Sequence, residues 1–287
     1  MNGFINVLKP VGATASDCVV CIKQTLKQKK VGHLGTLDPG AAGVLPVAVG
    51  SATKLFDLLA NKIKVYRAFF TFGKTTDTLD SYGVVSGSGG SIPSDEELRK
   101  NAQYFVGSID QIPPIYSALS VGGVRAYKLA REGVELQLKS RKTTVYSFDY
   151  IRKESADTFV FDIKCSGGTY IRSLARDLAD ACGTIGYMSG LIRLQSGCFL
   201  IENAFTLDEI RDKKQDCVSD VMYPLSDLPS VDYSSKYFKN IDFGQKVVPC
   251  DCAGYHKVYC DGVFFGVGKA DGKTLDLQYY LKNLDKQ

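Results

Sequence analysis

The sequence has 287 residues, and its 35 Lys and Arg against 31 Asp and Glu give a formal charge of +4, too small to indicate a polyanionic partner by itself. A chain of this length can bury about three quarters of its unfolded surface, so it can form a large domain, with or without a small one, in the absence of disulfides. Nine scattered cysteines are typical of a reduced, cytoplasmic protein. Uncharged runs such as 41 to 53 are shorter than the ~20 residues of a membrane span.

In chain order, the first predicted element is a helix that Ser16 can cap. Its apolar stripe includes Val19, Ile22 and Leu26. Four lysines without an intervening acid lie on its polar face and just after it: Lys23, Lys27, Lys29 and Lys30.

Residues 31 to 50 read VGHLGTLDPGAAGVLPVAVG, with five glycines and a single acid, Asp38. Such a segment can turn sharply and approach a ligand closely while it presents one carboxylate. It lacks the Gly-Lys-Ser/Thr ending of a phosphate-binding loop, which disfavours nucleoside triphosphate binding. On residue types alone, an ordinary surface turn with an Asx hydrogen bond at Asp38 stays open beside a catalytic role.

Strands and helices then alternate. Residues 65–72 predict a strand, and a capping box formed by Ser94 and Glu97 starts a helix. The segments 145–151 and 159–165 alternate as strands, and the second runs through a tight glycine turn into another helix. The mixture predicts an α+β fold.

Between residues 204 and 235 the sequence becomes polar and rich in turn signals, which predicts a domain boundary near residue 230. We therefore expect a main domain at 1–229 and a small, largely β domain at 230–287, with Asp-Gly turns between its strands. Four residues of the small domain have types that can bind zinc, but their spacing fits no familiar zinc motif, and we expect no metal site. They are Cys250, Cys252, His256 and Cys260.

Five segments, spread over nearly the whole chain, resemble the bacterial tRNA pseudouridine synthase B (TruB) family. They are Lys9-Pro10 with Gly12 and Thr14, GHLGTLDPGAAGVLP at 32–46, KVYRAFFTFGKTTDTLDSYG at 64–83, QIPPIYSA at 111–118 and CSGGTYIRSLARDLA at 165–179. GHLGTLDP, TDT-x-D and GTYIR in this order form a highly specific set. The resemblance implies a pseudouridine synthase fold, with a mixed, mainly antiparallel sheet flanked by helices, and a small β-rich PUA-like C-terminal domain.

The resemblance implies that the chain isomerises uridine-55 in the TΨC arm of tRNA to pseudouridine, without a metal or an organic cofactor. Asp38 stands at the position of the nucleophile, which attacks the uridine while its base detaches, rotates and rejoins through carbon. Arg172 matches the arginine that pairs with this nucleophile and keeps a buried carboxylate ionised. From the pattern alone, a surface arginine that pairs with Asp177 or stays unpaired is also open.

The resemblance also implies a pocket for the extruded base. Tyr66 aligns with the tyrosine that packs on the base, and it is a candidate for removing the proton from the base carbon. Tyr170 and Leu191 align with other pocket residues, and His33 with the histidine that helps to fill the space left by the extruded nucleotide. Ordinary core roles for Tyr66 and Leu191, and a turn role for His33, stay open.

Residues 120 to 142 carry six basic and two acidic residues and resemble an inserted flap that closes over the tRNA arm. A solvated charged helix is the alternative. Six residues are expected to contact the RNA backbone: Lys29, Lys30, Arg125, Lys128, Arg131 and Arg141.

We expect a monomer that acts on the tRNA TΨC stem-loop without an obligate protein partner, a guide RNA or a membrane. A non-catalytic RNA-binding or tRNA-folding protein is the alternative from another functional class. Such a protein would have no need for Asp38 together with Arg172.

Overall fold

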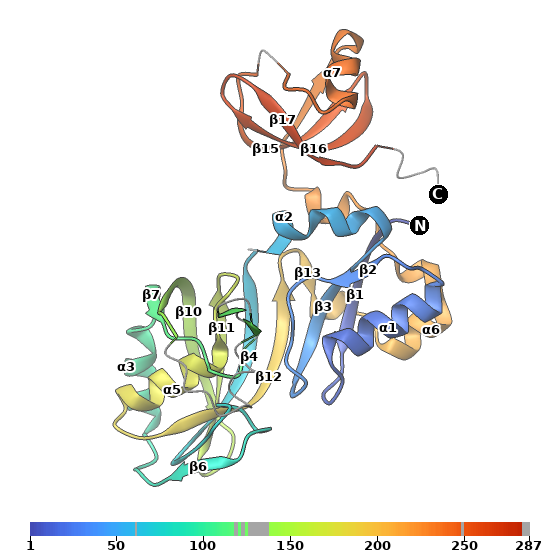
Figure 1. Ribbon diagram of the computed structural model, residues 1–287. Helices are drawn as coiled ribbons and strands as arrows, with labels where there is room; N and C mark the ends of the chain where they lie inside the picture. The colour runs from blue at the N-terminus through green and yellow to red at the C-terminus, as the bar shows by residue number, and fades with distance from the viewer. Residues whose placement is uncertain (61, 118–119, 122–123, 126–137, 248–249, 283–287) are drawn as a thin grey trace.

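The computed structural model describes residues 1–60, 62–117, 120–121, 124–125, 138–247 and 250–282, and Figure 1 shows a large sheet with helices and a smaller β-rich part beyond α2. The helices are α1 (Ala15–Leu26), α2 (Phe56–Ala60), α3 (Asp95–Gln103), α5 (Ile171–Ala181), α6 (Leu207–Lys213) and α7 (Phe238–Asp242). The strands are β1 (Gly3–Lys9), β2 (Val31–His33), β3 (Ala41–Val49), β4 (Lys64–Phe72), β5 (Lys74–Thr76), β6 (Val85–Ser88), β7 (Gly107–Gln111), β8 (Ser120–Val121), β9 (Val124–Arg125), β10 (Arg141–Lys153), β11 (Thr158–Cys165), β12 (Gly186–Ser196), β13 (Phe199–Leu200), β14 (Ser230–Tyr233), β15 (Ala253–Cys260), β16 (Val263–Asp271) and β17 (Leu275–Tyr280).

The main sheet follows the order β1-β3-β12-β4-β11-β10-β7, with β2 beside β3 and β13 beside β12. Its strand pairs are antiparallel except for β12 with β3, which is parallel. The predicted α+β class with a mixed, mainly antiparallel sheet is therefore confirmed. In this order β12, from late in the chain, lies between β3 and β4.

The predicted strand at 65–72 lies within β4, and its alternation builds the core beside the site. Phe70 and Phe72 are fully buried, and Tyr66 on the same face is 7% exposed. The Phe70 ring lies 5.1 Å from that of Phe161 on the neighbouring strand β11 and 6.1 Å from that of Phe148 on β10, the next strand along. Side chains of α3 and α5 complete this cluster. The aromatic core thus fixes β4 and α5, which carry Tyr66 and Arg172.

Ser16 does not cap α1, contrary to the prediction. Thr14 is the N-cap, since its backbone is extended and its hydroxyl accepts a hydrogen bond from the Asp17 backbone N–H at 3.0 Å. The Asp17 carboxylate accepts from the Thr14 backbone N–H in return, at 2.8 Å. This reciprocal pair satisfies two N–H groups, whereas Ser16 lies inside the first turn.

Gly43 lies where β3 pairs with β12, opposite Arg193. Its φ is +104°, and a Cβ there would lie 2.3 Å from the Arg193 carbonyl oxygen. We expect Gly43→Ala to lower the free energy of unfolding by about 3 kcal/mol or more, because the two strands must separate at this point.

Urea unfolding followed by circular dichroism measures this loss, with Gly183→Ala as the matched control. Gly183 also has a positive φ, +67°, but a Cβ there would meet no atom within 4 Å. The control should lose only about 1 kcal/mol. Equal losses in the two variants would contradict the collision with β12.

The chain ends in a small β domain whose four strands pair in the order β14-β15-β16-β17. Val267 and Leu281 belong to the same buried cluster as Leu55, the last residue of η1 (Gly50–Leu55), and Leu59 of α2. The Nζ of Lys54 donates to the Tyr280 carbonyl at 2.9 Å. These contacts attach the β domain to the end of the main domain that carries α2, as Figure 1 shows. We propose that the boundary lies at residue 230, where β14, the first strand of this four-stranded sheet, begins.

Candidate active site

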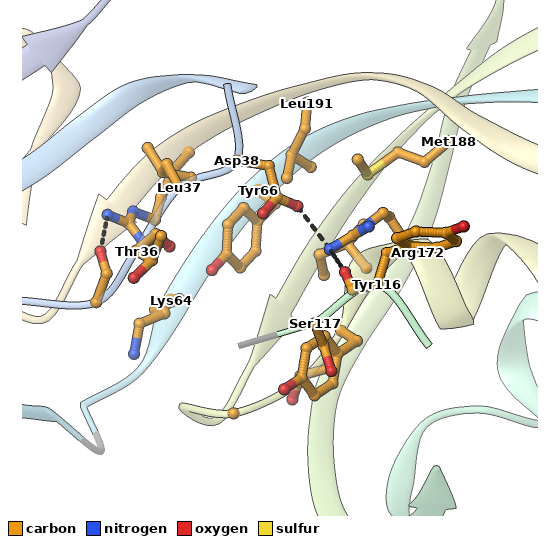
Figure 2. A pocket seen from close by; sticks show the side chains of 16 residues that line it. Thr36, Leu37, Asp38, Lys64, Tyr66, Tyr116, Ser117, Arg172, Met188 and Leu191 are labelled. Atoms are coloured by element: carbon orange, nitrogen blue, oxygen red, sulfur yellow. Dashed lines mark hydrogen bonds and ion pairs between the residues drawn. The ribbon is translucent and has the colours of Figure 1, made fainter. Parts of the chain in front are cut away.

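A cavity of 570 Å³ opens where the loop before β3 meets β4, β12 and the start of α5, and Figure 2 shows the side chains around it. This volume is in the range of pockets that hold one small ligand. Its lining comes from separate stretches of the chain: Gly35, Thr36, Leu37, Asp38, Lys64, Tyr66, Tyr116, Ser117, Gly168, Thr169, Tyr170, Ile171, Arg172, Met188, Leu191 and Arg193.

A buried lysine on β1 hydrogen-bonds the backbone next to the loop that carries Asp38. Lys9 is fully buried, and its Nζ donates to the carbonyls of Pro10 at 2.9 Å and Ala41 at 2.6 Å. The Gly12 backbone N–H donates to the Pro39 carbonyl at 2.8 Å. The side chain of Asp38 remains 40% exposed, so a ligand in the cavity can reach its carboxylate.

Arg172 joins Asp38 to a second carboxylate. Its Nη2 lies 3.0 Å from the Asp38 Oδ2, and its Nη1 lies 3.1 Å from the Asp80 Oδ2. The guanidinium also donates to the carbonyls of Thr78 and Tyr116, each at 3.1 Å. The Arg172 side chain is only 9% exposed. Because a guanidinium is a planar fork of donors, these four acceptors fix its orientation and therefore the direction from which it meets Asp38.

The alternative role for Arg172, a surface pair with Asp177, is excluded by the geometry. Asp177 pairs instead with Arg176, whose Nη2 lies 2.6 Å from its Oδ1. Arg172 faces the cavity from the first turn of α5. The two arginines, one turn apart on α5, therefore have different acid partners.

The walls beside the carboxylate are apolar and aromatic. Tyr66 is 7% exposed, Leu191 8% and Met188 4%. Figure 2 shows the Tyr66 ring beside Asp38, with Arg172 on the other side of the carboxylate. Tyr170 is fixed by Gln111, which accepts from its backbone N–H at 2.8 Å and donates to its carbonyl at 3.0 Å. Tyr66 and Leu191 thus belong to the core and also line the cavity.

Two cations of the cavity were not identified from the sequence. Arg193 is 1% exposed, and it donates to the carbonyls of Val44 at 2.7 Å and Gly35 at 3.1 Å, which holds the loop before Asp38. Lys64 lies two residues before Tyr66, and burial, with repulsion from Arg193, lowers its pKa to about 8. The available signal was a charged residue at an inward-facing position of an alternating strand. Asp80, the last residue of the TDT-x-D element, is a third residue that was missed, since the sequence did not indicate its contact with Arg172.

Lys64 should make the stability depend on pH. Since its pKa is about 8 in the folded chain and 10.5 as an ordinary lysine, the unfolded chain binds more protons between these values. Stability therefore rises with pH in this window. We expect the free energy of unfolding of the wild type, relative to Lys64→Met, to rise by about 3 kcal/mol from pH 8 to pH 10.5.

Urea denaturation at the two ends of the window measures this difference. Lys164→Met is the control, because Lys164 is an exposed lysine of the neighbouring strand β11 and its replacement should leave the wild-type slope unchanged. Parallel curves for the wild type and Lys64→Met would contradict the prediction.

Several other predicted residues lie outside the cavity lining. His33 is half-buried on β2, and burial, together with Arg193, lowers its pKa, so the ring is neutral at pH 7. Lys29 and Lys30 are exposed beyond the far end of β3, since the Lys30 carbonyl accepts from Gly50 at 2.7 Å. The length of β3 places them roughly 25 Å from the Asp38 end. They stay predictions for RNA backbone contacts.

The flap residues divide into two groups. Arg141 is exposed at the start of β10, paired with Gln111, which fixes Tyr170, so it lies near the rim of the cavity. Lys128 and Arg131, and the side chain of Arg125, lie outside the described residues. Within the described parts of the chain, no group of three or more metal-binding side chains gathers, and no helix is long and apolar enough to span a membrane.

The family described as TruB family pseudouridylate synthase (N terminal domain) matches residues 23–171, more than half of the chain. The chain belongs to this family. A tRNA pseudouridine synthase B of Clostridium perfringens is 39% identical over 291 residues, which cover 98% of this chain and 99% of the relative. One of Caldanaerobacter subterraneus is 40% identical over 280 residues, 96% and 97% of the two chains. The TruB resemblance is therefore confirmed.

Solved structures of related fold agree with the family. The crystal structure of a Cbf5-Nop10-Gar1 complex superposes with a TM-score of 0.74 at 25% identity, and covers 98% of this chain and 84% of that chain. The crystal structure of the archaeal box H/ACA sRNP Nop10-Cbf5 complex gives 0.71 at 23% identity, with 97% and 85% covered. The agreement extends over the β domain as well as the main sheet. The predicted pseudouridine synthase fold is confirmed.

Proposed function

We propose that the chain is a tRNA pseudouridine synthase that isomerises uridine-55 of the TΨC arm, with Asp38 as the nucleophile. The observation that carries the proposal is the Asp38–Arg172 ion pair at 3.0 Å, at the wall of a cavity of a size that suits one nucleoside. TruB family membership and the names of the relatives support the tRNA substrate.

The site chemistry fits an isomerisation. The bond from the sugar to the base nitrogen breaks, a bond from the sugar to a base carbon forms, and one proton leaves that carbon while another joins the nitrogen. No electrons are exchanged with a second reactant, so the reaction needs no redox group. A carboxylate can form the transient covalent link by itself. The Arg172 guanidinium lies 3.0 Å from the Asp38 carboxylate and meets it with a planar, charged donor. We therefore infer that Arg172 orients the nucleophile.

Tyr66, Leu191 and Tyr170 would bind the extruded base, with Tyr66 as the stacking surface. Burial raises the pKa of Tyr66, despite the nearby Arg193, which disfavours the phenolate that a general base would require. We therefore assign Tyr66 to packing and leave the carbon proton to another acceptor. His33 is assigned to the space that the extruded nucleotide vacates, and its neutral ring would enter that space without a charge.

The partners follow from the same site. We propose that the protein acts as a monomer on the TΨC stem-loop, and that Lys29, Lys30 and Arg141 contact the phosphates. We also propose that it is located in the cytoplasm, which its nine free cysteines support. The solved Cbf5 structures are complexes with Nop10, whereas we propose that this chain acts without a partner protein or a guide RNA. A non-catalytic RNA-binding protein would explain the basic residues but not the Asp38–Arg172 pair.

The test incubates the purified chain with an unmodified tRNA transcript, without added protein or guide RNA, and maps pseudouridine by carbodiimide labelling and primer extension. We expect product at position 55 alone. A transcript with cytidine at this position is the matched control and should give no product. Product at another uridine would overturn the assigned site, and no product at all would overturn independent action.

A further inference from the structure

Two cysteines of the C-terminal β domain lie in contact, apart from the cavity of the active site. The Sγ atoms of Cys250 and Cys252 are 2.9 Å apart. Cys250 is 4% exposed, whereas Cys252 is half-buried, so solvent reaches the pair through Cys252. A disulfide has a sulfur–sulfur distance near ~2.05 Å, so bond formation needs less than about 1 Å of further approach.

Backbone hydrogen bonds hold both cysteines against the hairpin between β16 and β17. The Cys250 backbone N–H donates to the Lys273 carbonyl at 3.1 Å, and the Gly272 N–H donates to the Cys252 carbonyl at 2.9 Å. The two thiols are therefore adjacent before any reagent arrives, and closing a bond between them requires little new ordering of the chain.

The two thiols also differ in their chemistry. Burial opposes ionisation of Cys250, but hydrogen bonds from Cys252 outweigh it and lower the pKa of Cys250 below the ordinary value. Burial, and then its hydrogen bond to Cys250, raises the pKa of Cys252 to about 11. The two sulfurs thus share one short contact, in which either can be the hydrogen-bond donor. A reagent in solvent meets the more exposed Cys252 first, and the buried Cys250, with its lowered pKa, is placed to resolve a mixed disulfide.

A tetrahedral zinc site does not explain the pair. Structural zinc requires four ligands, and no third metal-binding side chain joins the two cysteines within the described residues. The neighbouring candidates are engaged elsewhere: the Cys260 thiol donates to the Ser234 carbonyl at 3.5 Å, and the His256 ring contacts the Gly254 carbonyl at 3.2 Å. Two adjacent thiols are sufficient for a different reaction, the formation of a disulfide.

We propose that Cys250 and Cys252 form a reversible intramolecular disulfide by exchange with small-molecule disulfides. Cys252 loses its proton to solvent and attacks one sulfur of the reagent, which releases one small thiolate and leaves a mixed disulfide. The thiolate of Cys250 then attacks the Cys252 Sγ, and the second small thiolate departs. Two protein thiols are oxidised, one small disulfide is reduced to two thiols, and the two cysteine protons end on these products.

The test exposes the reduced, full-length protein to oxidised glutathione, blocks the remaining free thiols with N-ethylmaleimide in denaturant, and analyses peptides by mass spectrometry. We expect the peptide that contains Cys250 and Cys252 to lose two hydrogen atoms and to carry no maleimide, and dithiothreitol to reverse this. Cys260 is the internal control and should be alkylated. Alkylation of both cysteines, or glutathione that stays attached to the wild-type protein at Cys252, would overturn the proposal.

Two variants separate the roles of the sulfurs. Cys250→Ser should accumulate the glutathione mixed disulfide at Cys252, because the resolving thiolate is gone. Cys252→Ser should lose the internal disulfide completely and leave Cys250 free. Circular dichroism checks that each variant is folded, and the wild-type peptide result stands independently if either is not. Mixed disulfide on Cys250 rather than Cys252 would overturn the assigned order of attack.

Discussion

Asp38→Asn is expected to remove pseudouridine formation while tRNA binding persists. Asparagine keeps the shape of the side chain and can still accept from Arg172, but it lacks the charge of a nucleophile. We expect kcat/KM to fall by about 10⁴-fold or more, the scale on which loss of a nucleophile acts in other covalent mechanisms. Single-turnover assays on a tRNA transcript measure the rate, and filter binding measures the affinity.

Asp110→Asn is a suitable control for Asp38→Asn, since Asp110 is an exposed acid on β7 outside the cavity lining. It should keep the wild-type rate within about twofold, because surface substitutions of this kind have small effects. If Asp38→Asn turned over as fast as this control, the assignment of the nucleophile would be wrong. If both variants lost tRNA binding, the cause would lie in the fold and not in the chemistry.

Arg172→Met is expected to cost both stability and activity. It removes the partner of Asp80, whose side chain is 15% exposed, and leaves the carbonyls of Thr78 and Tyr116 without the donor at 3.1 Å. Breaking a buried ion pair by removing one partner costs about 3–5 kcal/mol. Activity should fall with it, because Asp38 loses its cation. Urea unfolding and single-turnover assays measure the two losses separately.

Two further variants give this prediction its specificity. Arg172→Lys keeps the charge but not the fork, so it should recover part of the stability while activity stays reduced by about 10²-fold or more. Arg176→Met, on the same helix, breaks the partly exposed pair with Asp177 and should cost about 1 kcal/mol or less. An Arg172→Met protein as stable and active as Arg176→Met would show that the network at Asp38 does not matter.

The sequence predicted the parts of the fold that rest on local pattern. The alternation around Tyr66 predicted β4, and the Ser94–Glu97 pair predicted the start of α3, where the structure has the same capping box. The start of α1 was predicted wrongly, because Ser16 and Thr14 are both good caps and only the reciprocal bond to Asp17 distinguishes them. Local sequence patterns therefore predict the presence of a helix or strand more reliably than the residue at which it begins.

The site required non-local information. Asp38 and Arg172 lie 134 positions apart in the chain, and only the family motifs suggested that they meet. Lys64 and Arg193 were missed because an alternating strand does not reveal which inward position faces a cavity and which faces the core. Asp80 was missed for a related reason. Its role depends on the side of the cavity from which Arg172 approaches, and spacing along the chain does not contain that information.

The position of β12 between β3 and β4 has a consequence for synthesis of the protein. Residues 41–49 and 64–72 leave the ribosome long before Gly186–Ser196, yet β12 separates their strands in the finished sheet. The edges of β3 and β4 that pair with β12 therefore stay unpaired until β12 has been synthesised. We expect nascent chains that end before residue 186 to present exposed strand edges and no formed cavity, which makes them natural clients for chaperones that act at the ribosome exit.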